Sequence, residues 1–211
     1  MTKGIIFDLD GVIVYTDKFH FRAWKQMAEE LGFALDEQVN HRLRGVSRMD
    51  SLNVVLEGYE GEPLSEEEKQ KWAERKNDIY RSFLATMTPA DVTDEVRETL
   101  AELHKRGYRL AVGSSSKNAR LILDKIALTD VFDAISDGNN ITKSKPEPEV
   151  FLKAAEYIKL RPEECLVVED AYAGIDAARA GNMKSVGIGE ASEYGKADYH
   201  IKTLKELLYF L

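Results

Sequence analysis

The chain has 211 residues, of which 44% are hydrophobic, so it can bury one substantial core or two smaller ones. Its 37 acidic and 29 basic side chains give a net charge of −8, which argues against nucleic acid as the main partner, because no basic stripe is present to neutralise phosphates. The single cysteine, Cys165, excludes an internal disulfide. No apolar run has the length of a membrane span and no signal-peptide core is present, so we expect a cytoplasmic protein that does not enter a membrane.

The first predicted element is a strand over residues 5–7, a continuous apolar run typical of a strand covered on both faces of a parallel sheet. It leads into Asp8-Leu9-Asp10-Gly11, which could close a hairpin, since Asp and Gly are common in turns. No partner strand follows, however, because apolar residues then recur at helical spacing: Phe21, Trp24, Met27, Ala28 and Leu31. The sequence therefore places both carboxylates at the end of a strand that enters a crossover, where ligands bind in open α/β sheets.

Residues 15–88 contain helical patterns and no convincing strand, which predicts an inserted helical cap domain between two parts of a core domain, residues 1–14 and 89–211. The last helix of the insert is predicted to begin at Ser65, where Ser-Glu-Glu-Glu forms a capping box, and to run up to Pro89. Hinges at the two connections would let the insert close over the carboxylates of the core.

The remaining chain alternates strands and helices. Further strands are predicted within residues 108–115, 134–137, 165–170 and 184–189, and helices over 94–107 and 117–128, the second with Ser116 as its N-cap. Strands that alternate with helices of this length are typical of an α/β fold with a doubly wound parallel sheet.

Polar residues from four segments should meet at the carboxyl edge of this sheet. They are Asp8, Asp10, Ser114, Lys145, Glu169 and Asp170. Each has a plain structural explanation when taken singly, as a turn hydroxyl, a surface lysine or a charge at a helix N-terminus. Their common position is harder to explain in that way. Carboxylates from two strands suit Mg²⁺, and a lysine and a hydroxyl beside them would hold phosphoryl oxygens.

The same arrangement predicts phosphoryl transfer. The carboxylate of Asp8 can attack phosphorus in line and form an aspartyl-phosphate. Asp10 lies two residues further along an extended chain, so its side chain can lie on the same side as that of Asp8 and move a proton to or from the reacting hydroxyl.

Four segments resemble the motifs of the haloacid dehalogenase superfamily: "FDLDGVI", the turn at Ser114, "SKPEPEVF" and "VVEDAYAGIDAARAG". Within it, residues 20–32, 44–52, 74–80 and 113–119 are similar to the β-phosphoglucomutase family. The resemblance implies a Rossmann-like core with an α-helical cap. It also implies an isomerase of carbohydrate metabolism that interconverts β-D-glucose 1-phosphate and β-D-glucose 6-phosphate, through a phosphorylated enzyme and β-D-glucose 1,6-bisphosphate.

The resemblance also implies roles for individual residues. Asp8 would be the nucleophile and Asp10 the general acid and base, with Mg²⁺ held by Asp8, the Asp10 backbone carbonyl and Asp170, and Glu169 close by. Ser114 and Lys145 would hold the transferred phosphoryl group. The implied substrate-binding residues are His20, Arg44, Gly45, Val46, Arg48, Lys76, Asn77, Ser115, Ser116, Lys117 and Asn118. Among these, Arg48, Ser116, Lys117 and Asn118 would hold the second phosphate. Tyr15 and Met49 depart from the family pattern, which usually has acidic residues there.

Two other functions compete with this one. A sugar-phosphate phosphatase of the same superfamily would share every core residue and let water release phosphate from Asp8, but it has no need for Arg48 and Lys117 together. A phosphoacceptor signalling module would also combine acidic residues, a hydroxyl and a lysine around Mg²⁺, and would act by a change of shape. The proton-transfer role of Asp10 and the long helical insert fit that module poorly. The expected partners are small sugar phosphates, and the expected state is a monomer.

Overall fold

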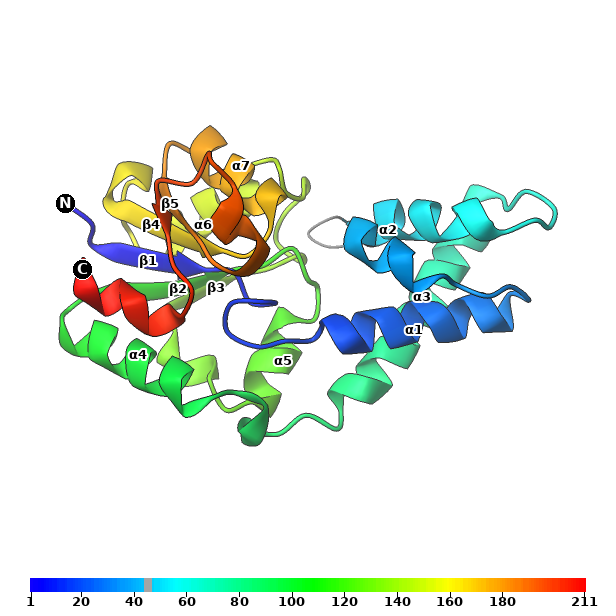
Figure 1. Ribbon diagram of the computed structural model, residues 1–211, viewed down its shortest axis with the longest axis horizontal. Helices are drawn as coiled ribbons and strands as arrows, with labels where there is room; N and C mark the ends of the chain where they lie inside the picture. Colours follow the sequence, from blue (N-terminus) through cyan, green and yellow to red (C-terminus); the bar gives the residue numbers. More distant parts are fainter. Residues whose placement is uncertain (44–46) are drawn as a thin grey trace. The chain divides into compact units, whose positions relative to one another are not determined.

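The computed structural model describes residues 1–43 and 47–211 (Figure 1). The chain divides into two compact units, which we call the core unit (residues 1–15 and 87–211) and the helical unit (residues 16–86). Within the described part of the chain, none of the helices is both long and apolar enough to cross a membrane.

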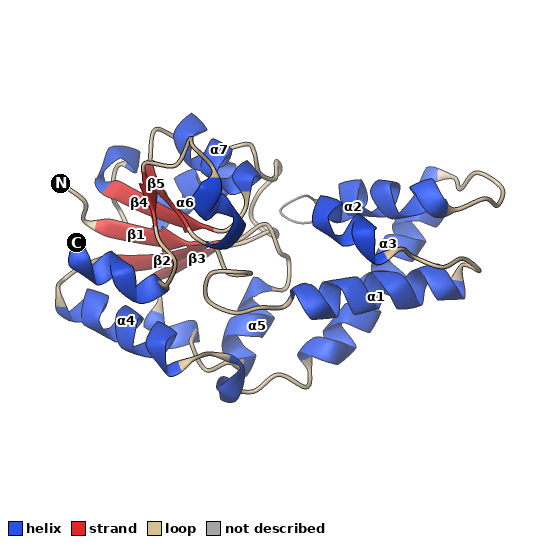
Figure 2. Cartoon of the chain, in the orientation of Figure 1, coloured by secondary structure: helices blue, strands red, loops and turns tan. Residues whose placement is uncertain are grey.

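The core unit is built on a six-stranded parallel sheet in the order β3-β2-β1-β4-β5-β6 (Figure 2). Its strands are β1 (Gly4–Phe7), β2 (Arg109–Gly113), β3 (Ala134–Ser136), β4 (Cys165–Glu169), β5 (Lys184–Gly187) and β6 (Tyr199–His200). The predicted parallel α/β fold is thereby confirmed. Because β1 pairs in parallel with both β2 and β4, the Asp-Leu-Asp-Gly segment after it closes no hairpin.

Helices flank this sheet. The α-helices of the core unit are α4 (Asp94–Lys105), α5 (Ala119–Lys125), α6 (Glu149–Tyr157) and α7 (Tyr172–Ala180), and short 3₁₀ turns are η3 (Pro89–Asp91), η4 (Thr129–Val131), η5 (Pro162–Glu164), η6 (Gly189–Glu193) and η7 (Leu204–Tyr209). Apolar residues of α6 and α7, among them Phe151 and Ala178, pack with Ile6, Ala111 and Val167 of the sheet. These strand residues are fully buried, as the continuous apolar run at β1 predicts.

Two details of the core unit differ from the sequence prediction. The helix expected from residue 117 begins at Ala119, and Asn118, not Ser116, occupies the N-cap position. The hydroxyl of Ser116 instead accepts a hydrogen bond from Asn118 N at 3.2 Å, so this serine closes a turn before the helix. The edge strand β6 was not predicted, because two residues are too few to give an alternating pattern.

The helical unit contains α1 (Asp17–Glu30), η1 (Glu37–Leu43), α2 (Arg48–Val55), η2 (Leu56–Gly58) and α3 (Glu66–Leu84). The predicted capping box is present, since Ser65 Oγ accepts from Glu68 N and the Glu68 carboxylate accepts from Ser65 N. Helix α3 ends earlier than expected because the backbone N and the hydroxyl of Thr86 both donate hydrogen bonds to Phe83 O, which closes a turn at the end of the helix. Helices α1 and α3 pack together through buried side chains that include Trp24 and Tyr80.

Candidate active site

Asp8 follows β1 directly and is buried, with 7% of its surface exposed. Its backbone N donates to Val168 O of β4 at 2.9 Å, which continues the sheet pairing by one residue. The chain then turns at Gly11, whose φ of +84° favours glycine. A Cβ at this position would lie 2.0 Å from Asp170 Oδ2. Gly11 is therefore required both by the turn and by the close approach of a second carboxylate.

The second pair of carboxylates stands at the end of β4, where Glu169 is the last strand residue and Asp170 follows it. Glu169 Oε2 accepts from Ala171 N at 2.8 Å. A Cβ on Gly174 of α7 would lie 1.9 Å from Glu169 Oε1, so the glycine lets the helix pack closely against this buried side chain.

Lys145 connects the end of β1, at Asp8, with the end of β4, at Glu169. It lies between β3 and α6, is buried, and donates from Nζ to Asp8 Oδ1 and to Glu169 Oε1, at 2.5 Å each. Its ammonium group also lies 4.7 Å from the centroid of the Phe151 ring. The preceding loop is held by Glu149, whose Oε2 accepts from the backbone N of residues 142 and 143 at 2.9 and 2.8 Å. Sequence reasoning missed Glu149 and Phe151 as supports of Lys145, although both stand in the "SKPEPEVF" motif.

Electrostatics in this cluster favour a bound cation. Burial raises the pKa of Asp8 to about 7; Lys145 opposes this effect, while Glu169 and Asp10 add to it. Burial, together with the charges of Glu169 and Asp8, raises the pKa of Asp170 to about 9. Burial alone would lower the pKa of Lys145, but Asp8 and Glu169 raise it.

Among the described residues, four carboxyl groups thus interact at this site, two of them in contact with the Lys145 ammonium group, and their oxygens are the donors that Mg²⁺ prefers. Among the described residues, no three His, Cys, Asp or Glu side chains are already grouped as a metal site. Glu169 has both oxygens engaged, one by Lys145 and one by Ala171 N. The donor set fits a divalent cation at Asp8, Asp10 and Asp170, and Glu169 holds the lysine.

The loop of residues 114–118, which we call the 114–118 loop, follows β2. Ser114 is buried and its N donates to Ser136 O at 3.0 Å. Ser116 N donates to Ser114 Oγ at 3.2 Å, so two hydroxyls, those of Ser114 and Ser116, each close a turn within the loop. Ser115 Oγ is buried and has no hydrogen-bond partner among the described residues. The loop thus carries the hydroxyl, ammonium and amide groups of Ser114, Lys117 and Asn118.

The other predicted site residues lie in the helical unit. Arg48 on α2 donates to Asn77 Oδ1 on α3 at 2.8 Å, and Lys76 Nζ lies 2.9 Å from His20 Nδ1. Lys76 is buried and its ammonium group lies 4.5 Å from the Trp24 ring centroid. Arg44, Gly45 and Val46, which the resemblance implies as substrate-binding residues, lie outside the described residues.

His20 is held neutral by its surroundings. Burial, Lys76 and Arg48 keep the pKa of His20 well below its usual value of 6.5. Its ring stacks on that of Tyr80, with centroids 4.0 Å apart, and the neutral Nδ1 accepts from the Lys76 ammonium. The helical unit therefore presents two cations, Lys76 and Arg48, whose geometry is fixed by neutral polar partners.

The structure thus brings Asp8, Lys145 and Glu169 into direct contact. Asp10 is close enough to raise the pKa of Asp8, and Asp170 is close enough for Glu169 and Asp8 to raise its own pKa. Ser114 stands at the end of the adjacent strand β2. His20 and Lys76, and Arg48 and Asn77, form two pairs in the helical unit.

Comparison with known proteins agrees with this arrangement. The sequence pattern of the haloacid dehalogenase-like hydrolases matches residues 5–188. The β-phosphoglucomutase of Bacillus subtilis is 37% identical over 206 residues, which cover 97% of this chain and 91% of that protein. The fructose-1-phosphate phosphatase of Escherichia coli is 30% identical, over 88% of this chain and 95% of its own.

Among solved structures, the crystal structure of β-phosphoglucomutase from Clostridium difficile superposes with a TM-score of 0.90 at 38% identity, and covers 98% of this chain and 93% of that one. Both a mutase and a phosphatase are therefore similar to this chain over most of their length. On the family pattern and these identities, the chain belongs to the haloacid dehalogenase-like hydrolases and is an enzyme of that superfamily.

Proposed function

We propose that the protein is a β-phosphoglucomutase, which interconverts β-D-glucose 1-phosphate and β-D-glucose 6-phosphate. One observation supports the proposal: besides Lys145 at Asp8, the chain has side chains whose chemistry suits a second phosphate, Arg48, which donates to Asn77 in the helical unit, and Lys117 and Asn118 on the 114–118 loop of the core unit. A bisphosphate intermediate has one phosphate at the reacting carboxylate and one elsewhere, so it needs two such sets.

In one half-reaction, Asp8 accepts a phosphoryl group from β-D-glucose 1,6-bisphosphate, which leaves as a glucose monophosphate. A carboxylate oxygen of Asp8 attacks phosphorus, the bond from phosphorus to the sugar oxygen breaks, and Asp10 gives its proton to the leaving oxygen. Lys145, which already donates to Asp8, neutralises phosphoryl oxygens, and the hydroxyl of Ser114 donates to another. In the other half-reaction, a hydroxyl of β-D-glucose 1-phosphate gives its proton to Asp10 and attacks the phosphorus on Asp8, which restores the free carboxylate and forms the bisphosphate.

Asp8, the backbone carbonyl of Asp10, and Asp170 would hold Mg²⁺ in this site, because the oxygens of Glu169 are already engaged. When bound, Mg²⁺ would supply positive charge that neutralises the phosphate and orients one of its oxygens. The residues of the chain perform the transfer itself.

The helical unit is proposed to act as a cap that opens between the two half-reactions, so that the bisphosphate can reverse its orientation. His20, Lys76, Arg48 and Asn77 would then contact the sugar and the second phosphate. We further propose that the protein acts as a monomer in the cytoplasm. Cys165 is buried, and burial raises the pKa of its thiol to about 12, so the thiol is unreactive and is compatible with a reducing cytoplasm.

A sugar-phosphate phosphatase is the second candidate, favoured by the phosphatases among the relatives. It would use the same Asp8 and Asp10, with water in place of the sugar hydroxyl. The two reactions differ in their products, since a mutase conserves the phosphoryl group and a phosphatase releases it.

The test is a coupled assay for glucose 6-phosphate, started with β-glucose 1-phosphate, Mg²⁺ and a trace of glucose 1,6-bisphosphate, with free phosphate followed in parallel. A mutase gives glucose 6-phosphate without matching free phosphate, and Asp8→Asn abolishes the product. Stoichiometric free phosphate would instead establish the phosphatase. Arg48→Ala gives a second criterion, since it should slow mutase turnover more than the release of phosphate from a small phosphomonoester.

A further inference from the structure

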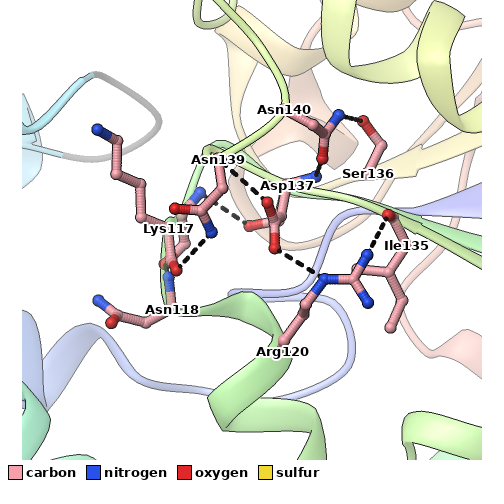
Figure 3. A network of polar contacts seen from close by, with 10 residues as sticks. Lys117, Asn118, Arg120, Ile135, Ser136, Asp137, Asn139 and Asn140 are labelled. Atoms are coloured by element: carbon pink, nitrogen blue, oxygen red, sulfur yellow. Dashed lines mark hydrogen bonds and ion pairs between the residues drawn. The ribbon is translucent and has the colours of Figure 1, made fainter.

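Two polar segments meet beside the carboxyl ends of β2 and β3. One is the 114–118 loop, and the other is the turn of residues 137–140, here called the 137–140 turn (Figure 3). Gly138 N donates to Ser116 O at 3.2 Å, and Asn139 Nδ2 donates to Lys117 O at 2.9 Å. The turn therefore holds two consecutive carbonyl groups of the loop.

These two contacts set the direction of the loop backbone. In a trans peptide the N–H points opposite to the C=O of the same peptide group. Holding Ser116 O and Lys117 O against the turn therefore directs the N–H groups of Lys117 and Asn118 away from it. Figure 3 shows the side chains of Lys117 and Asn118 also directed away from Asp137.

The turn is itself held in one conformation by its side chains. Asn139 N donates to Asp137 Oδ1 at 2.9 Å, and Asp137 N donates to Asn140 Oδ1 at 2.7 Å. Asp137 is buried, and its Oδ2 lies 3.5 Å from Arg120 Nε on α5. The Asn139 side chain thus extends from a fixed backbone, so that its amide meets Lys117 O in a defined position.

Close approach of the two segments depends on Gly138. A Cβ at this position would lie 2.4 Å from Ser115 O and 2.9 Å from Lys117 N. Backbone atoms cannot move aside cheaply, so the glycine permits the contact that Asn139 completes.

We propose that Asn139 is a positioning residue, which orients Lys117 and Asn118 for the second, non-transferred phosphate without touching the substrate. The inference rests on the proposed function in assigning that phosphate to Lys117 and Asn118. Lys145 lies later in the same connection between β3 and α6, but it donates to Asp8 and Glu169, and the residues before it are held by Glu149, so none of these contacts uses the Asn139 amide. Loss of the Asn139 amide should therefore affect the binding of a second phosphate and leave phosphorylation of Asp8 unchanged.

The test compares Asn139→Ala and the isosteric Asn139→Asp, which lacks the amide donor, with wild type. We expect KM for β-glucose 1-phosphate to rise about three- to tenfold, the range that the loss of one hydrogen bond gives, with kcat changed less than about twofold. The rate of phosphoryl transfer from acetyl phosphate, which carries no second phosphate, should be unchanged. Asn53→Ala, at an exposed position of α2, is the matched control and should alter neither value.

A second variant tests whether the network acts as a unit. Arg120→Ala removes the ion pair to Asp137 Oδ2, while Asp137 Oδ1 still accepts from Asn139 N, and should raise KM in the same direction but by less. The double variant Asn139→Ala with Arg120→Ala should show less than the product of the two separate effects, because both act through the same turn. Effects that multiply independently would contradict a shared network.

A binding measurement separates this inference from the proposed function. In the inactive Asp8→Asn background, Asn139→Ala should weaken the binding of β-glucose 1,6-bisphosphate about three- to tenfold by calorimetry. If wild type forms no glucose 6-phosphate, the proposed function fails, but this comparison still decides the role of Asn139. Unchanged KM and Kd, or an equal loss of acetyl phosphate turnover with a lower Tm, would overturn the inference.

Discussion

At the scale of single residues, Lys145 is paired with two buried carboxylates, those of Asp8 and Glu169. Removing one partner of a buried pair leaves the other charges uncompensated, which costs about 3–5 kcal/mol. We therefore expect Lys145→Met to lower the free energy of unfolding by about 3 kcal/mol, measured by urea unfolding in EDTA. It should also abolish phosphorylation of Asp8.

The matched control is Lys143→Met, because the Lys143 side chain is exposed two residues earlier in the same loop. Its free energy of unfolding should stay within about 0.5 kcal/mol of wild type. A Lys145 variant as stable as this control would show that Asp8 and Glu169 do not need the ammonium group in the folded protein.

His20 makes stability depend on pH. Since burial, Lys76 and Arg48 lower the pKa of His20 in the folded protein, the unfolded chain binds a proton near pH 6.5 that the folded chain does not. The contribution of His20 should therefore lower stability as pH falls below about 6.5, by at most about 1.4 kcal/mol per pH unit, whereas Asp8 and Asp170, with pKa values raised to about 7 and about 9, contribute with the opposite sign over this range. The difference between His20→Asn, which retains an acceptor for Lys76, and wild type isolates the contribution of His20 between pH 5 and 7.

The control for this prediction is His200→Asn, since His200 is exposed on β6. It should retain the wild-type slope in urea unfolding at the same pH values. An unchanged slope in His20→Asn would mean that His20 does not contribute to the pH dependence of stability.

The sequence predicted Asp8, Ser114, Glu169 and Asp170 at one edge of the sheet, because each lies at the end of a parallel strand, and it predicted Lys145 beside them although this residue lies in the loop between β3 and α6. It could not predict the partners of these residues. That Glu169 holds Lys145 depends on the loop before α6, whose path is set by tertiary contacts. Asn139 was missed for the same reason, as a single asparagine in a turn carries no local signal for a contact 22 residues away.

At the scale of elements, α6 packs against the site through Phe151, whose ring contacts the Lys145 ammonium group. Phe151 is fully buried, and a Cβ at Gly113 of β2 would lie 2.6 Å from its ring, so the strand packs tightly on the helix. Removing the ring should leave a cavity under Lys145. We expect Phe151→Ala to lower the free energy of unfolding by about 3–5 kcal/mol, measured by urea unfolding.

Leu152, the next residue on α6, is 36% exposed and provides the control. Leu152→Ala should cost less than about 1 kcal/mol. Equal losses in the two variants would indicate that the stability of the helix itself, and not the packing of Phe151 beneath Lys145, determines the effect.

Elements with a strong local signal were predicted well. The apolar runs gave five of the six strands, since buried parallel strands have continuous apolar sequences. The capping box gave the start of α3 at Ser65. The predicted start of α5 was wrong because the Ser116 hydroxyl closes a turn before the helix and does not cap it. A serine hydroxyl can do either, and the sequence does not decide between the two.

At the scale of the whole molecule, the negative charge of the chain is concentrated in part at its site. Burial, together with the charges of Glu169 and Asp8, raises the pKa of Asp170, so keeping this carboxyl group in the folded protein costs stability. Asp170→Asn removes that cost, so we expect a higher Tm than wild type in EDTA. Mg²⁺ should raise the Tm of wild type and should not raise that of the variant. At 100 times its Kd, the ion should add up to about 2.7 kcal/mol to the free energy of unfolding of wild type.

Thermal unfolding with and without Mg²⁺, at constant ionic strength set by NaCl, checks this prediction. Asp124→Asn, an exposed position on α5, is the charge-matched control and should respond to Mg²⁺ as wild type does. An Asp170→Asn variant that Mg²⁺ stabilises as strongly as wild type would place the cation elsewhere.

The central position of β1 has a consequence for synthesis of the chain. Of the strands in this sheet, β1 precedes all the others along the chain, and its neighbours β2 and β4 begin only at residues 109 and 165. Its fully apolar side chains must therefore wait, unpaired, while most of the polypeptide leaves the ribosome. The helical unit is one continuous segment, so all its partners are present once residue 86 has emerged. During translation the inserted helices can fold first, and the nascent core remains a potential chaperone client until β4 is complete.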